Sequence, residues 1–314
     1  MINEYIKFMR KIILILILIL ATSCSLESNL SEKTIQERNF HPEITEIEVW
    51  EEEYLILEKE NFAPDVIQLS DGTYKIYYNS VQSLNGIGSA TSEDGFTYTK
   101  DEGARLENLG EGQECTSSHP WLMEFDNGYR MYYQSDANCA QSTKKDFRIY
   151  SAFSEDGYNF EREGVLIEPT DENGLNEPAH GRIIQLNDGT YRMYFSTGFI
   201  DKTGPSDIIG ATSEDGLTWV LDDEVIIDDG HDPTVYMDDN NMIHIYTTFL
   251  GDNMLHLISE DGYNFEIVSW VEFYNNDQRI EDFGDIDIIE IDGELYIFGS
   301  GKGSNGISIM KRIE

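Results

Sequence analysis

One short motif recurs along the chain and limits what the chain can fold into. Ser-Glu-Asp-Gly begins at Ser92, Ser154, Ser213 and Ser259, so successive copies are 62, 59 and 46 residues apart. An aromatic residue stands three positions after each glycine, at Tyr98, Phe160, Trp219 and Phe265. Self-similarity at periods of roughly 40 to 60 residues is typical of arrays in which each repeat is one supersecondary unit, such as the blades of a β-propeller.

A second motif occurs five times and predicts β-hairpins. It is an apolar run, a turn rich in Asp, Asn and Gly, and then an aromatic-rich run. Asp-Gly and Asn-Gly turns between such runs are strong hairpin signals. The five apolar runs with their aromatic partners are 66–69 with 74–78, 122–125 with 129–133, 183–186 with 191–195, 235–237 with 243–246, and 288–291 with 295–298.

The two motifs together predict a repeat of four strands, with the Ser-Glu-Asp-Gly turn between the third and the fourth. The fifth repeat ends at 306–312 without that turn and without a fourth strand. Near the N-terminus, Trp50 precedes Leu55 at the same offset as Phe160 precedes Val165, so residues 46–57 match the missing strand. We therefore predict an all-β, five-bladed β-propeller of four-stranded antiparallel blades, closed by an N-terminal strand, which leaves no open sheet edge.

The first residues predict a targeting segment. Lys7, Arg10 and Lys11 precede nine consecutive Ile and Leu residues at 12–20, which are too few to span a bilayer and suit a signal peptide. Ala21-Thr22-Ser23-Cys24 then resembles the lipobox of bacterial lipoproteins, although Ala21 stands where Leu, Val or Ile is usual. We expect a signal peptide over 1–24, lipidation of Cys24, a polar tether over 25–41 and a single propeller domain over 42–314. Ordinary secretion with cleavage near Ser23 is the alternative.

Two further cysteines would lie in an oxidising compartment. Cys115 and Cys139 each lie twelve residues from Asn127, in the turn of one hairpin. Residues equidistant from a hairpin turn face one another across the strands, so we predict a disulfide between them. Two free thiols are the alternative.

The charge of the chain restricts its partners. The net charge is −39, and a field of that sign repels nucleic acid and anionic lipid headgroups. We expect no nucleic-acid partner, membrane contact through the lipid anchor alone, and a monomer. The predicted location is the cell envelope, anchored to the outer or plasma membrane.

Polar residues stand where the first strand of each repeat begins. These starts converge on the axis of a propeller, where residues that only pack would be apolar. Carboxylates and histidines gathered there suit sugar binding or acid–base catalysis. The residues at these starts are Asp65, His119, Glu177, His180, Arg182, His231, Asp232, Asp285 and Asp287.

The hairpins with Asp-Gly turns and the Ser-x-Asp-Gly turns resemble the five-bladed propeller glycosidases, such as glycoside hydrolase families 43, 32 and 117, over about residues 46–314. His231-Asp232-Pro233 resembles their Asp-Pro strand start, and Glu177-Pro178-Ala179-His180 resembles the Glu-Gly-Pro-His around the acid of family 43. Asp65 matches the blade-one aspartate, but it follows its proline instead of preceding it. Glu177 also precedes Asp232 in the chain, whereas family 43 has the reverse order, so the roles would be permuted or the catalytic set lost.

This resemblance implies an O-glycosyl hydrolase that acts on an oligosaccharide or polysaccharide. Two carboxylates flanking the scissile bond would provide the acid and base, and we expect Asp65, Glu177 and Asp232 to be catalytic. The expected substrate-binding residues are His119, His180, Arg182, His231 and Asp287. We expect no cofactor and no catalytic metal, with room for a structural calcium ion in the central channel.

Two other functions fit parts of the pattern. A non-catalytic glycan-binding lipoprotein would keep the polar residues on the axis but lack a matched acid and base. A sialidase-like enzyme is the third hypothesis, although sialidases use six blades and three arginines, and Arg182 is the one arginine among these strand starts. The aspartates of the four Ser-Glu-Asp-Gly turns are expected to be structural, because such side chains bond the backbone of their own turn.

We predict that mass spectrometry of the mature protein under non-reducing conditions will find Cys24 lipidated and Cys115 joined to Cys139. Alkylation of two thiols after denaturation would contradict the disulfide. An unmodified residue 24 would contradict the anchor.

Overall fold

The computed structural model describes residues 44–58, 61–80, 85–110, 113–138, 146–170, 175–198, 206–249, 253–301 and 306–313. The predicted signal peptide and tether, with Cys24, lie outside these ranges, and so does Cys139. The predicted disulfide and lipidation therefore stay predictions. Residues Thr45–Glu314 form one compact unit, and the rest of this subsection concerns that unit. No helix in the described ranges is long and apolar enough to cross a membrane.

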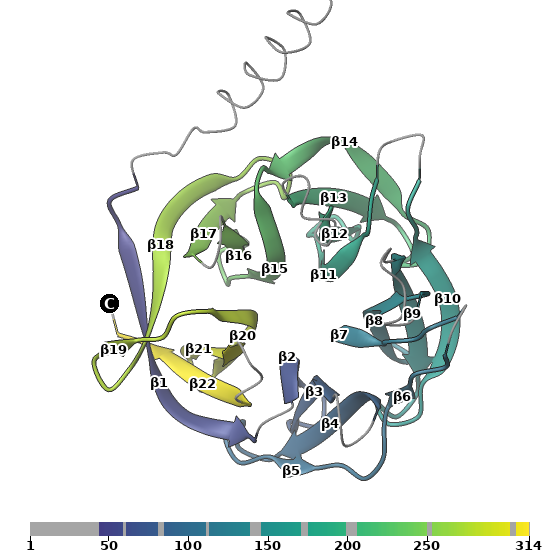
Figure 1. Ribbon diagram of the computed structural model, residues 1–314, viewed down its shortest axis with the longest axis horizontal. Helices are drawn as coiled ribbons and strands as arrows, with labels where there is room; N and C mark the ends of the chain where they lie inside the picture. Colours follow the sequence, from purple (N-terminus) through teal and green to yellow (C-terminus); the bar gives the residue numbers. More distant parts are fainter. Residues whose placement is uncertain are drawn as a thin grey trace, which may run out of the picture. The chain divides into compact units, whose positions relative to one another are not determined.

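The unit is a ring of five antiparallel blades, as the two repeats predict (Figure 1). Blade one contains β2 (Asn61–Gln68), β3 (Tyr74–Ser80), β4 (Gly86–Ser92), β5 (Thr99–Lys100) and β6 (Leu106–Glu107). Blade two contains β7 (Ser118–Phe125), β8 (Gly128–Asp136), β9 (Phe147–Ser154) and β10 (Glu161–Ile167). Blade three contains β11 (Ala179–Gln185), β12 (Tyr191–Thr197), β13 (Asp207–Ser213) and β14 (Val220–Ile227).

Blade four contains β15 (Gly230–Met237), β16 (Ile243–Phe249), β17 (Asn253–Ser259) and β18 (Glu266–Asn275), with the short β19 (Gln278–Arg279) beside β18. Blade five contains β20 (Phe283–Ile291), β21 (Glu294–Gly301), β22 (Ile307–Arg312) and the N-terminal β1 (Ile47–Leu57). The first strands β2, β7, β11, β15 and β20 lie innermost, around the centre of the ring (Figure 1).

The N-terminal strand closes the ring, which confirms the prediction for residues 46–57. β1 pairs antiparallel with β22 from Trp50 to Leu57. It also pairs in parallel with β18 from Ile47 to Glu51. One strand therefore joins blades four and five into a single continuous sheet, a link that the repeat pattern did not predict.

The Ser-Glu-Asp-Gly turns are structural, as expected. In blade three, Asp215 Oδ1 accepts hydrogen bonds from the backbone N–H groups of Leu217 (2.8 Å) and Thr218 (2.7 Å). These bonds, stronger than the opposing effect of burial, hold the pKa of Asp215 at about 2. The same bonds recur around Asp94, Asp156 and Asp261, so the aspartate fixes the turn from within.

A tyrosine of the second strand joins each of the first three blades to the turn of the next blade. The hydroxyls of Tyr77, Tyr132 and Tyr194 donate to the carbonyl oxygens of Gly157, Gly216 and Gly262 at 2.8, 3.1 and 3.0 Å. The Ser-Glu-Asp-Gly turn requires glycine for two reasons. Gly216 has φ +72°, and a Cβ there would lie 2.6 Å from the hydroxyl of Tyr132.

The apolar core lies between neighbouring blades. Leu57 and Ile309 of blade five pack with Ile76 and Tyr78 of blade one. Tyr246 of blade four packs in the same way with residues of blade five, such as Trp50 and Ile297. Since each blade buries its faces against two neighbours, a missing strand in one blade would expose the core of both junctions.

We predict that deletion of residues 46–57 will abolish cooperative thermal unfolding or cause aggregation, because β22 and β18 would lose their partner. Deletion of residues 25–37 should do neither. Circular dichroism melts with light scattering would compare the two truncations, and equal stability would contradict closure by β1.

Candidate functional site

The innermost strands share a bulge near their starts. In each of them the pairing with the second strand skips residues, between Phe62 and Asp65 in blade one and at matching places in the others. One residue in each bulge has a positive φ, between 44° and 54°. These five residues, called the axial ring here, are Ala63, His119, His180, Asp232 and Asp285. Left-handed backbone in non-glycine residues costs about 1–3 kcal/mol each and concentrates at functional sites.

Four members of the axial ring form two histidine–carboxylate pairs. Nδ1 of His180 lies 2.5 Å from Oδ1 of Asp232, in neighbouring blades three and four. Nε2 of His119 lies 3.3 Å from Oδ1 of Asp285, although blade one stands between their blades. Ala63 is the blade-one member, and its methyl group leaves room for that contact. The rings of His119 and His180 lie 4.3 Å apart, so both pairs belong to one cluster.

The preceding blade holds two of these strained residues in place. Gln134 Oε1, on β8, accepts the backbone N–H of His180 at 2.8 Å. Ser196 Oγ, on β12, accepts the backbone N–H of Asp232 at 3.0 Å and lies 3.4 Å from Nδ1 of His180. The strands β8 and β12 therefore help to position the His180–Asp232 pair.

His180 is buried and Asp232 is half-buried, and the carboxylate of Asp232 stays ionised. Burial alone would raise the pKa of Asp232, but the charge and hydrogen bond of His180 outweigh it and leave the pKa below its usual range. Burial lowers the pKa of His180, opposed by the charge of Asp232. At neutral pH the pair thus presents an ionised carboxylate, held in place beside an imidazole. This carboxylate can accept a proton or stabilise a positive charge.

A second layer of charged residues lies beneath the ring. Asp65, Arg182 and Asp287 stand two residues beyond their ring members, and each is 2% exposed. Asp65 Oδ2 accepts the backbone N–H of Leu122 in blade two at 2.9 Å. Asp287 Oδ2 accepts the backbone N–H of Val66 in blade one at 2.6 Å. These carboxylates therefore join blades five, one and two through their backbones.

The two buried carboxylates hold their protons more tightly than usual. Burial and the charge of Asp287 raise the pKa of Asp65 well above its normal value. Burial raises the pKa of Asp287 to about 6, although the Val66 amide and the Arg182 charge oppose it. Because their bonds go to backbone amides and they are covered from solvent, their geometry suits support of the ring above.

The predicted site residues thus fall into three groups. His119, His180 and Asp232 belong to the ring, together with Asp285, while Asp65, Arg182 and Asp287 lie one layer below. Glu177 and His231 are half-buried neighbours of the ring, and Glu177 itself has φ +48°. A proline directly follows the ring residue in three blades, at Pro64, Pro120 and Pro233. Alignment of the repeats on this proline would have assigned Ala63, and not Asp65, to the ring.

Three ring residues could hold a metal ion. Donor atoms of His119, His180 and Asp232 all lie within 4.8 Å of one another. Two imidazole nitrogens with one carboxylate oxygen form a donor set typical of zinc and similar ions. Calcium prefers oxygen ligands throughout, so this set does not fit the expected structural calcium.

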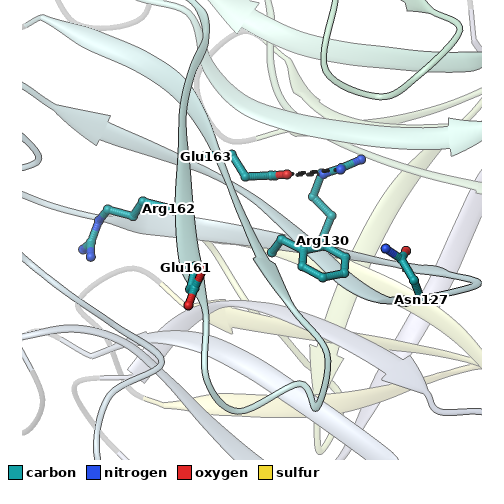
Figure 2. Close-up of a pocket in the computed structure, with 6 residues that line it drawn as sticks. Asn127, Arg130, Glu161, Arg162 and Glu163 are labelled. Atoms are coloured by element: carbon teal, nitrogen blue, oxygen red, sulfur yellow. Dashed lines mark hydrogen bonds and ion pairs between the residues drawn. The ribbon is translucent and has the colours of Figure 1, made fainter.

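A pocket of about 330 Å³ lies away from the ring, on β10 and the β7–β8 turn of blade two. Figure 2 shows Arg130 facing Glu163 while Arg162 points away from it. Arg130 is paired with Glu163 at 2.8 Å, and Arg162 with Glu114 at 2.8 Å. Because the charges of Arg130 and Arg162 are already paired with carboxylates, this pocket has fewer groups available for binding or catalysis than the axial ring.

The curated relatives carry no functional description. Two uncharacterised proteins of Mycobacterium tuberculosis, from strains CDC 1551 / Oshkosh and ATCC 25618 / H37Rv, are each 31% identical over 183 residues. The match covers 57% of this chain and 58% of the length of those relatives. No protein-family model matches the chain.

Solved structures with a similar fold include glycoside hydrolases. A family 117 enzyme of Zobellia galactanivorans aligns with a TM-score of 0.66 at 15% identity, over 85% of this chain and 90% of that one. A thermostable family-43 enzyme gives 0.63 at 16% identity, over 84% and 92%. An α-L-arabinofuranosidase of Lactobacillus brevis gives 0.62 at 11% identity, over 84% and 93%. At these identities the likeness confirms the propeller fold.

We predict that Asp65→Ala will lower the free energy of unfolding by about 1–3 kcal/mol, because the buried N–H of Leu122 loses its acceptor. Asp65→Asn keeps an acceptor oxygen and should cost less than about 1 kcal/mol. Urea unfolding at pH 7 would measure both. Equal losses in the two variants would show that the bond to Leu122 is not what Asp65 contributes.

Proposed function

We propose that this protein is a glycoside hydrolase that binds an oligosaccharide or polysaccharide over the axial ring. The observation that carries the proposal is the convergence of two histidine–carboxylate pairs from four blades onto strained, equivalent positions. Strain of this kind persists where the surrounding structure fixes it, and it concentrates at sites that act on ligands. The shared fold with family 117 and family 43 enzymes supports a sugar as the ligand.

Asp232 is the proposed base or nucleophile. It is ionised, its side chain is 17% exposed, and His180 and Ser196 fix its orientation. Glu177 is the proposed acid, because it is half-buried and precedes His180 by three residues on the same approach to the axis. The proposed ligands of the sugar hydroxyls are His119, Asp285 and His231. A hydroxyl can donate a hydrogen bond to a carboxylate and can either donate to an imidazole or accept from it.

Asp65, Arg182 and Asp287 receive positioning roles in this proposal. They are covered from solvent, and the two carboxylates bond the backbone of neighbouring blades. Their effect on turnover would pass through the ring above them. The proposal keeps the exported, lipid-anchored location of the sequence prediction, which would place the enzyme where extracellular polysaccharide is available.

A glycan-binding protein without turnover is the second candidate. Ala63 occupies the blade-one position of the ring with a methyl group, whereas the other four members carry groups able to act as acids or bases. A sialidase-like activity has less support. Arg182 lies beneath the ring at 2% exposure, and no ring member is an arginine.

We predict that the soluble domain will hydrolyse one of a panel of aryl glycosides and oligosaccharides. Solved neighbours include arabinofuranosidases and arabinanases, so 4-nitrophenyl α-L-arabinofuranoside and arabinan belong in the panel. Asp232→Asn and Glu177→Gln should each lower kcat by about two orders of magnitude, the usual scale for a positioned acid or base. Asp215→Asn, in an outer turn, is the matched control and should keep full activity.

Each outcome of this experiment separates the candidates. Full activity in both Asp232→Asn and Glu177→Gln would place the site elsewhere. Binding of a glycan that weakens in Asp232→Asn, with no turnover in the wild type across the panel, would favour the glycan-binding protein.

A further inference from the structure

The polar part of the axial ring is most exposed at its blade-five member. Side-chain exposure is 4% at His180, 11% at His119, 17% at Asp232 and 26% at Asp285. Nε2 of His119 lies 3.3 Å from Oδ1 of Asp285, and the blade between them contributes only the covered methyl group of Ala63. A ligand that approaches the ring therefore reaches the His119–Asp285 pair more readily than the buried His180.

The residues directly before the ring members differ in size from blade to blade. Each one pairs with a residue on the second strand of its own blade. Residues that face each other across antiparallel strands have their side chains on the same side of the sheet. These five residues, called the pre-ring residues here, are Phe62, Ser118, Ala179, His231 and Gly284.

The pre-ring side chains point toward the next blade. Gln134 and Ser196 are two of their second-strand partners, and both accept the backbone N–H of a ring member one blade further on. Phe62 has the same direction, because its ring lies 6.1 Å from that of His119 in blade two, at an angle of 71°. Phe62 is half-buried, so part of its ring is left for a ligand.

Blade five has no side chain at the pre-ring position. Apart from its neighbours in the chain, a Cβ atom at Gly284 would have one heavy atom within 4 Å, the hydroxyl oxygen of Thr248 at 3.9 Å. The space that a pre-ring side chain of blade five would take is therefore open. We call Phe62, His119, Gly284 and Asp285 the open sector of the ring.

The open sector combines an apolar surface with hydrogen-bonding groups. The face of an aromatic ring is negative, so the partly exposed ring of Phe62 can attract the C–H groups on one face of a sugar. The carboxylate of Asp285 can accept hydrogen bonds from sugar hydroxyls, and His119 can donate or accept. Binding sites for small molecules are typically lined in this way, with a few placed polar groups beside apolar surface.

The charges around the sector favour a neutral sugar. Asp232 and Asp285 are ring members, whereas no ring or pre-ring residue is a lysine or an arginine. Arg182 lies one layer below at 2% exposure and interacts there with the buried Asp65 and Asp287. A carboxylated or sulfated sugar in the sector would bring its negative charge against Asp285, which opposes binding.

We propose that the open sector is the subsite that holds a neutral sugar ring, with Phe62 against its apolar face and Asp285 and His119 on its hydroxyls. This inference rests on the proposed function and extends it to the position and the charge of the bound sugar. The proposed acid and base belong to blades three and four. Binding of this sugar and cleavage of its bond would therefore depend on different parts of the ring.

Isothermal titration calorimetry of the full mature chain tests the charge preference. Fragments of arabinan, galactan and xylan are the neutral probes, and galacturonan fragments are the acidic probe. At least one neutral probe should bind about tenfold more tightly than the acidic probe, because like charges placed together oppose binding. Asp285→Asn should reduce this difference. Tighter binding of galacturonan than of every neutral probe would overturn the proposal.

Two substitutions locate the subsite. Gly284 does not have a positive φ, so Gly284→Leu should fold normally and weaken binding about tenfold or more by filling the open space. Phe62→Leu should weaken binding about two- to tenfold, the range for loss of an aromatic contact, while Phe62→Tyr should match the wild type. For a probe that is cleaved, KM should rise while kcat changes less than about twofold in Phe62→Leu.

A matched control and the thermal unfolding midpoints complete the experiment. Phe125 is also half-buried, at the other end of an inner strand, so Phe125→Leu should bind like the wild type. Unchanged affinity in both Gly284→Leu and Phe62→Leu would overturn the subsite and leave the proposed function standing. A wild type that neither binds nor cleaves any neutral probe would overturn both. If Phe62→Leu failed to fold, Gly284→Leu alone would decide.

Discussion

A hydrogen bond from a tyrosine of one blade to a glycine carbonyl of the next sets the spacing of this propeller. Tyr77, Tyr132 and Tyr194 make the same bond three times. It requires a turn whose glycine has a positive φ and leaves space for the hydroxyl, which Ser-Glu-Asp-Gly provides. Because the blades repeat at this spacing, their inner strands begin at equivalent places and bring the axial ring together. At the last junction the tyrosine in the same position, Tyr246, donates instead to the carboxylate of Glu48 on β1.

The site on the axis consists of two layers with different tasks. The upper layer contains four polar side chains and Ala63 on strained backbone. The lower layer contains buried ionisable side chains, two of which bond the backbone of neighbouring blades. A strained residue keeps its conformation only when its surroundings fix it more strongly than its own preference opposes it. Gln134 and Ser196 provide that support from the side, and Asp65 and Asp287 provide it from below. Precise placement of His180 and Asp232 is therefore a property of the framework.

The repeats predicted most of the fold, because turn chemistry and hairpin patterning are local and recur in every blade. Closure by residues 46–57 was also predictable, since the offset from Trp50 to Leu55 copies that of a fourth strand. The layering on the axis was harder to predict. The start of each inner strand contributes several residues at successive depths, and the repeat pattern does not tell which of them has the left-handed backbone of the bulge. Asp65 was therefore predicted for a place that Ala63 occupies. Glu48 carried no repeat signal, because its partners Tyr246, His256, Ser269 and Arg312 lie in four other strands.

Closure by an N-terminal strand determines when the ring can be completed during synthesis. β1 is the first of the described strands to be translated, yet its antiparallel partner β22 is the last of them. Glu48 and Tyr246 are likewise 198 residues apart in sequence. Contacts of such separation form slowly, since a long loop must close before they contribute. A nascent chain can build blades one to three while the apolar face of β1 still lacks a partner. Chaperone binding during that interval would protect the first strand until the last one leaves the ribosome.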